Sequence, residues 1–259
     1  MRTILVALAI LVLTPPLGTL VIVASLLGVQ DGPHSVYQWA IRTWATALCR
    51  VAGVKIRLHN AERIRRDGPA VYVANHISWF DIFALASVLP RATFVAKAEL
   101  EKLPIFGRAC RAAGIVFIER ANRRAAFDTY KDAAAQVKEG RSVVVCPEGT
   151  RGRDYHLRPF KKGPFVFAIS TGAPIVPTIV HGTIAVQPKG SFRVRSGTVD
   201  LHFLEHVPTE GWSYDQRAQL MELVWSRMAD ALRDEYGVAT SEYAVAKEGD
   251  RPEKETSFL

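Results

Sequence analysis

Two clusters of polar side chains in this sequence have the residue types and the spacing that catalysis needs. The first cluster is residues 75–81 (NHISWFD), which directly follow the apolar run Val71–Ala74. Histidine is the natural general base near neutral pH, and it needs a partner that fixes its tautomer. Asp81 stands five positions after His76, so it can reach one ring nitrogen and leave the other to accept a proton. A helix cap is the alternative, because Ser78 and Asp81 have the spacing of a capping box.

The second cluster is residues 147–151 (PEGTR), which directly follow a candidate strand at 142–146. A turn that contains Gly149 presents backbone N–H groups, and the planar guanidinium of Arg151 offers five donors suited to phosphate. An ordinary turn between a strand and a loop explains the same residues equally well. The cluster alone therefore leaves both interpretations open.

Other polar residues are weaker candidates. Lys97 and Arg120 follow apolar runs at 93–96 and 115–118, but a cation at the end of a strand is usually a solvated terminus. His202 and His206 form a close pair, and a strand would place both on one face. A zinc site needs more ligands than these two, so we predict no metal site.

Short β-branched runs alternate with helical patterns from about residue 54 onward. The predicted strands are 54–58, 70–73, 93–96, 115–118, 142–146 and 175–180. The predicted helices are 81–89, 123–138, 164–170 and 215–236. This alternation predicts an α/β domain with a mixed, largely parallel central sheet flanked by helices. Residues 192–195 and 199–204, separated by a Ser-Gly-Thr turn, predict a late antiparallel hairpin.

Several familiar cofactor and nucleophile motifs are absent from the sequence. No Gly-x-Gly-x-x-Gly follows a strand, which disfavours nicotinamide and flavin cofactors. The phosphate loop of nucleotide hydrolases is missing, and so is the Gly-x-Ser-x-Gly turn around a nucleophilic serine. The residues present therefore favour direct attack by a histidine-activated hydroxyl over a covalent acyl-enzyme.

The composition is that of a globular protein with a basic surface. Of 259 residues, 49% are apolar and 22% charged, and the formal net charge is +8. This surplus favours anionic partners such as phosphorylated metabolites, lipid surfaces or nucleic acid, although no nucleic-acid recognition motif is present. The three cysteines (Cys49, Cys110 and Cys146) are far apart, which disfavours a disulfide framework and fits a reducing compartment.

The N-terminal segment has the composition of a membrane anchor. No charged residue lies between Arg2 and Asp31, but Pro15 and Pro16 interrupt the run. Each apolar part is shorter than the roughly 20 residues that a membrane span needs, so a kinked span and a re-entrant hairpin both fit. A cleaved signal peptide is disfavoured, because a single arginine is a weak n-region and no convincing small-x-small cleavage site follows the apolar run. Basic residues follow the run and place its C-terminal side, with the bulk of the protein, in the cytoplasm.

A second helical pattern follows the break at 31–33. Trp39 and Trp44 stand beside Arg42 and Arg50 in this segment, which suits an amphipathic helix at headgroup level. A helix that packs on its own domain through the same tryptophans is equally compatible with the sequence.

The chain is therefore divided into three regions. We expect membrane-anchoring helices at 1–53, a catalytic domain at 54–238 and a mobile tail at 239–259. The tail is predicted from its charge and its few apolar residues.

The order and spacing of four segments resemble the sequence blocks of the 1-acyl-sn-glycerol-3-phosphate acyltransferases, also called lysophosphatidic acid acyltransferases or PlsC-like proteins. The resemblance covers about residues 54–205 and includes a segment similar to the family's Lys-x-Glu-Leu, at Lys97. The four segments are Asn75-His76-x4-Asp81, Phe117-Ile118-x-Arg120, Pro147-Glu148-Gly149-Thr150-Arg151 and Val176-Pro177.

The resemblance implies transfer of an acyl chain from acyl-CoA or acyl carrier protein to the 2-hydroxyl of lysophosphatidate. The product would be phosphatidate, an intermediate of phospholipid biosynthesis, and no cofactor or metal is expected. In the family the His-x4-Asp motif supplies a base and the acid that orients it, which implies these roles for His76 and Asp81. Binding of the acceptor's phosphate is implied for the remaining motif residues, which are Lys97, Arg120, Glu148, Gly149, Thr150 and Arg151.

Two alternatives stay open at this point. An acyltransferase for another lyso-lipid, such as lyso-ornithine lipid, would share the whole set of motifs. A non-catalytic membrane protein that binds anionic lipid would explain the anchor and the arginines, but not the spacing of His76 and Asp81.

Overall fold

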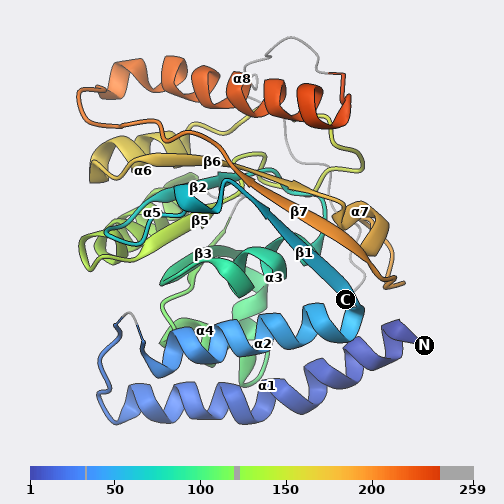
Figure 1. The fold of residues 1–259 in the computed structure, drawn as a ribbon. Coiled ribbons are helices and arrows are strands. Elements are labelled where there is room, and N and C mark those ends of the chain that lie inside the picture. Colours follow the sequence, from blue (N-terminus) through green and yellow to red (C-terminus); the bar gives the residue numbers. More distant parts are fainter. Residues whose placement is uncertain (33, 120–122, 240–259) are drawn as a thin grey trace.

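The structure is a computed structural model that describes residues 1–32, 34–119 and 123–239. Its strands form one seven-stranded sheet (Figure 1). The strands are β1 (Val54–His59), β2 (Val71–Ala74), β3 (Ala92–Lys97), β4 (Val116–Ile118), β5 (Ser142–Val145), β6 (Ile175–His181) and β7 (Gly197–Phe203). Every strand predicted between residues 54 and 180 is present, with ends shifted by one residue at most.

Helices α1 to α8 and three short 3₁₀ helices accompany the sheet in the described part of the chain. The first four α-helices are α1 (Arg2–Leu26), α2 (Val36–Ala52), α3 (Trp79–Val88) and α4 (Phe106–Ala112). The others are α5 (Arg123–Lys138), α6 (Gly163–Thr171), α7 (Thr183–Val186) and α8 (Arg217–Tyr236). The 3₁₀ helices are η1 (Ala61–Arg63), η2 (Ala98–Lys102) and η3 (Tyr214–Gln216).

The strand order is β1-β7-β6-β2-β5-β3-β4, and neighbours are parallel everywhere except between β6 and β7. The strands β6, β2, β5, β3 and β4 therefore end at the same edge of the sheet, and β7 begins there. In open sheets of this kind ligands bind outside the carboxyl ends of the strands. We call this edge the carboxyl edge.

Helices cover both faces of the sheet, as Figure 1 shows. Tyr72 and Ala74 of β2 belong to a core shared with α2 and α3. Their neighbours Val71 and Val73 belong to a second core, shared with α5, α6 and α8. A strand that is buried on both faces has apolar residues at every position, which explains why the sequence pattern identified β2.

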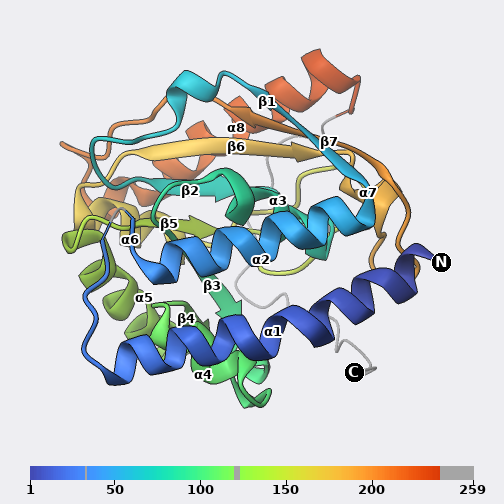
Figure 2. The same cartoon turned by 60° about the horizontal axis from the view of Figure 1, so that its bottom comes forward.

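Helix α1 lies beside α2 and α4 and forms an outer layer on one side of the molecule (Figure 2). It is one continuous helix that contains Pro15 and Pro16, so the hairpin alternative for this segment was wrong. Contacts with α2 help to hold the helix where prolines remove backbone hydrogen bonds: Trp44 Nε1 donates to Thr14 Oγ1 at 3.0 Å. By length and composition α1 could cross a membrane.

Helix α2 packs between α1 and α3. The ring of Trp44 meets that of Phe83 in α3 edge to face, with centres 5.2 Å apart, whereas Trp39 is exposed. The contact of Trp44 is the packing on the domain that the second alternative expects, and the exposure of Trp39 is compatible with the headgroup-level alternative.

The predicted hairpin at 192–195 and 199–204 was also wrong. Its second half is β7, which pairs in parallel with β1 and antiparallel with β6. Its first half is not a strand, because Val194 N donates to Thr3 Oγ1 of α1, while Arg195 N donates to Val186 O of α7. Helices α4 and α7 were not predicted, and residues 240–259 of the predicted tail lie outside the described residues.

Candidate active site

The turn between β2 and α3 places His76 and Asp81 in direct contact. His76 Nδ1 lies 2.9 Å from Asp81 Oδ2. The same oxygen accepts hydrogen bonds from the backbone N–H groups of Ile77, at 2.6 Å, and Ser78, at 2.8 Å. Ser78 is the N-cap of α3 and forms a capping box with Asp81. The two interpretations left open by the sequence are therefore both correct as geometry: Asp81 caps the helix and contacts the histidine.

The contact determines which nitrogen of His76 can act as a base. A carboxylate accepts, so the proton lies on Nδ1 and the lone pair of the ring lies on Nε2. Within the described residues Nε2 has no hydrogen-bond partner. Asp81 is fully buried, whereas the His76 side chain keeps 11% of its surface exposed. The His76 ring therefore contacts the buried carboxylate of Asp81 through Nδ1, and its Nε2 is available for a substrate.

Glu148, three residues after β5, lies behind this turn. Its Oε1 accepts from His76 N at 2.9 Å, and its Oε2 accepts from Arg158 N at 3.3 Å. Gly152 N donates to His76 O at 2.7 Å, so the loop after β5 holds both backbone groups of the histidine. The strands β2 and β5 are parallel neighbours, which is why residues 72 positions apart meet here.

Burial raises the pKa of Glu148 to about 7, although the hydrogen bonds from the His76 and Arg158 backbones oppose the shift. The side chain is buried, and both of its oxygens bond to the protein's own backbone. The resemblance implied acceptor binding for Glu148. In this structure its contacts are those of a residue that positions His76.

Asn75 contributes a contact that sequence reasoning missed. Its Nδ2 donates to Val180 O at 2.9 Å, and its Oδ1 accepts from Val180 N at 2.8 Å. The side chain thus bonds to β6 as another strand residue would, and it fixes the start of the turn that leads to His76. The only sequence signal was its place directly before the histidine.

Cations lie along the carboxyl edge beside this turn. The guanidinium of Arg151 is 5.0 Å from the centre of the Trp79 ring, at the start of α3. Thr150 Oγ1 accepts from Lys189 Nζ at 3.4 Å. Gly149 has φ +75°, a backbone conformation that favours glycine, and an added Cβ would lie 2.6 Å from Cε of Lys161. Lys161 and Lys189 were missed, because neither lysine belongs to a recognised motif.

The other two predicted cations are placed differently. Lys97 ends β3, next to β5, and its Nζ lies 3.2 Å from Glu99 Oε1 on an exposed surface. Arg120 lies outside the described residues, so its predicted contact with phosphate stays a prediction. The strand order nevertheless places the end of β4, at Ile118, at the same edge.

A second group of titratable side chains lies on the other half of the sheet. Among the described residues, His59, Asp200 and His202 have ligand atoms within 4.8 Å of one another. Arg57 bonds to both oxygens of Asp200, at 2.7 and 2.8 Å, and His202 Nε2 lies 2.5 Å from Tyr236 Oη. A guanidinium on both carboxylate oxygens competes with a metal ion, so these residues do not fit a metal site.

The histidine pair singled out in the sequence does not meet. His202 is on β7, but that strand ends at Phe203, and His206 Nε2 bonds to Arg63 O at 2.6 Å. The two imidazoles therefore have different partners.

Comparisons with known proteins connect this geometry to one family. A sequence model of the family described as Acyltransferase matches residues 55–181. The 1-acyl-sn-glycerol-3-phosphate acyltransferase of Saccharomyces cerevisiae is 32% identical over 241 residues, which cover 90% of this chain and 77% of the yeast protein. A chloroplastic 1-acyl-sn-glycerol-3-phosphate acyltransferase of Brassica napus is 38% identical over 149 residues, which cover 58% of this chain and 43% of that protein.

A solved structure has the same fold. The crystal structure of the 1-acyl-sn-glycerophosphate acyltransferase PlsC from Thermotoga maritima matches with a TM-score of 0.77 and 25% sequence identity. The match covers 93% of this chain and 97% of that chain. Against three plant relatives, by contrast, the chain spans only 43%, 54% and 62% of their length.

Proposed function

This chain belongs to the 1-acyl-sn-glycerol-3-phosphate acyltransferase family, and from that premise we propose that it acylates lysophosphatidate. An acyl chain passes from acyl-CoA or acyl carrier protein to the 2-hydroxyl of 1-acylglycerol-3-phosphate and gives phosphatidate, a step of phospholipid synthesis. The observation that best supports this proposal is the pair formed by His76 Nδ1 and Asp81 Oδ2, with Nε2 left at the carboxyl edge.

The reaction needs a base and an orienting acid but no metal, because a thioester is already activated. Nε2 of His76 takes the proton of the 2-hydroxyl as its oxygen attacks the thioester carbonyl carbon. The carbon–sulfur bond of the tetrahedral intermediate then breaks, and the imidazolium returns the proton to the departing thiolate. The buried carboxylate of Asp81 stabilises the imidazolium between these steps. A positioned base of this kind contributes about 10² to 10⁴ in rate.

The acceptor's phosphate would bind beside this base. The proposed contacts are Arg151, Thr150 and the backbone at Gly149, with Lys97 and Arg120 on the neighbouring strand ends. Arg151 suits this role, because a guanidinium matches phosphate with two parallel hydrogen bonds. Holding the acceptor in place adds the rate advantage of orientation to that of the base.

The N-terminal region would attach the enzyme to the membrane without being cleaved. Several apolar side chains on α1 are exposed, among them Ile4, Leu11 and Leu26. Helix α1 also packs along α2 and α4, and these two helices contain several arginines. A perpendicular span would move the arginines toward hydrocarbon, so the packing favours a helix that lies along the membrane surface. The catalytic domain would then face the cytoplasm, as the basic residues after the apolar run favour.

An assay of the purified protein with palmitoyl-CoA and lysophosphatidate in detergent tests the proposed activity directly. We expect phosphatidate and coenzyme A in equal amounts. Competition among lysophosphatidate, lyso-ornithine lipid and glycerol 3-phosphate then identifies the acceptor. A preference for lyso-ornithine lipid would contradict the proposed substrate, and no turnover with any acceptor would leave a lipid-binding protein.

Membrane attachment has its own test. Mass spectrometry of the mature protein should find an intact N-terminus, and carbonate washing should leave the protein on membranes. An N-terminus well after residue 20, or complete release by carbonate, would contradict the anchor.

A further inference from the structure

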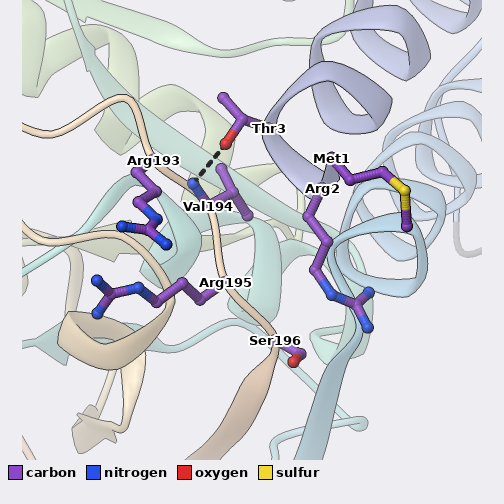
Figure 3. A pocket seen from close by; sticks show the side chains of 7 residues that line it. All are labelled: Met1, Arg2, Thr3, Arg193, Val194, Arg195 and Ser196. Carbon is purple, nitrogen blue, oxygen red and sulfur yellow. Dashed lines mark hydrogen bonds between the residues drawn. The ribbon is translucent and has the colours of Figure 1, made fainter.

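A basic pocket lies where the N-terminal end of α1 meets the segment that leads into β7. It is lined by residues 1–3 and 193–196 and has a volume of about 380 Å³ (Figure 3). Val194 N donates to Thr3 Oγ1 at 2.9 Å, and the Val194 side chain is buried in the core shared with α2 and α3. Residues 193–196, which carry two of the arginines, are therefore held against the first turn of α1.

The cations of this pocket lack counter-charges in the described part of the chain. The side chains of Arg2, Arg193 and Arg195 are exposed, and none forms a hydrogen bond or an ion pair with another described residue. Figure 3 shows the guanidinium groups of Arg193 and Arg195 extending to the same side of their segment. The guanidinium of Arg2 lies on the other side, against Gly53. Two adjacent guanidinium groups without a carboxylate suit a phosphate.

Exposed apolar side chains stand next to these arginines in the sequence and at the start of α1. Met1, at the start of α1, is 96% exposed, and Phe192, directly before Arg193, is 68% exposed. Ile4 and Leu8 continue the exposed apolar surface along α1. Apolar groups that enter the acyl-chain region beside cations at headgroup level are typical of a surface that binds anionic membranes. This composition favours a lipid headgroup over a soluble anion.

We propose that the pocket binds the phosphate of an anionic membrane phospholipid through Arg193 and Arg195, while Phe192 enters the bilayer. The proposal rests on the proposed membrane attachment and adds a second contact, far from α1 in sequence. This contact is connected to the candidate active site. Ser78 Oγ, at the start of α3, donates to Gln187 O at 2.7 Å, and Arg195 N donates to the carbonyl oxygen of the preceding residue, at position 186. The bound lipid would therefore hold the carboxyl edge against the membrane surface from which a lipid acceptor arrives.

Vesicle binding by the full-length protein tests the proposal. The double variant Arg193→Gln/Arg195→Gln is compared with Arg66→Gln/Lys138→Gln. The second variant removes the same charge from exposed sites before β2 and β5, at the opposite edge of the sheet. Thermal melting should show that both variants fold as the wild type does.

The expected result depends on the lipid. On vesicles of phosphatidylcholine with phosphatidylglycerol, the first variant should bind about 30-fold more weakly than the wild type, because each arginine near an anionic surface contributes about fivefold. The control variant should lose much less. On phosphatidylcholine alone, all three proteins should bind alike.

Two outcomes would overturn the proposal. One is equal binding of both double variants to the anionic vesicles, which would show that only net charge matters. The other is unchanged vesicle binding together with a raised KM for palmitoyl-CoA in detergent, which would assign the pocket to the donor's phosphates. Vesicle binding needs no turnover, so an inactive wild-type protein would contradict the proposed function and leave this test valid.

Discussion

Two pairs of histidine and aspartate in this molecule have nearly the same contact distance and different surroundings. His76 Nδ1 lies 2.9 Å from Asp81 Oδ2, and His59 Nε2 lies 2.8 Å from Asp200 Oδ1. Among the described residues, Asp81 otherwise accepts only from backbone N–H groups, whereas Asp200 is held by both arms of the Arg57 guanidinium. The distance alone does not distinguish a catalytic pair from a structural one.

In the second pair, the negative charge of Asp200 is balanced by neighbouring side chains. Desolvation raises the pKa of Asp200, but hydrogen bonds from Arg57 and His59 outweigh it, and the net effect lowers the pKa. The His59 ring also stacks on His202, with ring centres 3.9 Å apart. A carboxylate that already has a permanent cation stabilises an imidazolium less than one whose other partners are neutral. We therefore expect proton transfer at His76 rather than at His59.

The largest loss of acylation rate is expected when the pair of His76 and Asp81 is broken. His76→Ala should lower the acylation rate by at least about a hundredfold in a folded protein. Asp81→Asn keeps the shape of the cap but removes the charge, and it should lower the rate by about four orders of magnitude, as in serine-protease triads. Rates are measured with palmitoyl-CoA and lysophosphatidate, and folding by thermal melting. A nearly wild-type rate for Asp81→Asn would leave Asp81 as a cap alone.

The cations beside the first pair should have the next largest effect. Arg151→Ala should raise the KM for lysophosphatidate about ten- to hundredfold, because a charge-assisted hydrogen bond contributes roughly 1.5–3 kcal/mol. The KM for the acyl donor should change far less. Arg153→Ala, at an exposed arginine two residues further on, is the matched control. Equal effects on both substrates would indicate a structural role for Arg151. Arg120→Ala, measured in the same way, tests the binding of the acceptor's phosphate that the family resemblance implies for Arg120.

Glu148 supports the backbone of His76, and its contribution to the stability of the protein should depend on pH. The pKa of Glu148 is about 7 in the folded protein, against an ordinary value of 4.5, so the folded state binds the proton more tightly. Stability should therefore fall as pH rises from about 4.5 to about 7, by on the order of 3 kcal/mol, and Glu148→Gln should lack this fall. Melting temperatures of both proteins across this pH range measure it. Parallel curves would contradict the shifted pKa.

The smallest expected effect concerns the second pair. Asp200→Asn should leave the acylation rate near that of the wild type. It should lower stability only slightly, since the Arg57 side chain is 64% exposed and its ion pair is screened by solvent. Urea titration gives the stability and the acylation assay gives the rate. If Asp200→Asn lowered the acylation rate as much as Asp81→Asn, the conclusion that the two pairs differ in function would be contradicted.

Much of the fold follows from local patterns. The strands β2 and β5 consist almost entirely of apolar residues, and the helical periodicity of 123–138 gives the bounds of α5. The contact between His76 and Asp81 could also be predicted, since five residues across a helix start keep the two side chains within reach. The hairpin before β7 was predicted incorrectly, because its first half bonds to α1, 191 positions earlier in the chain.

The sequence by itself determined the strands between residues 54 and 180, the longer helices and the pair at the start of α3, because these depend on interactions within a few residues. Only the tertiary structure decided that Glu148 supports the His76 backbone, that Asn75 bonds to β6 and that Arg193 and Arg195 lie beside α1. These contacts depend on which strands and helices become neighbours. Neighbours are selected by the packing of whole apolar faces, and the spacing of residues along the chain does not encode that choice.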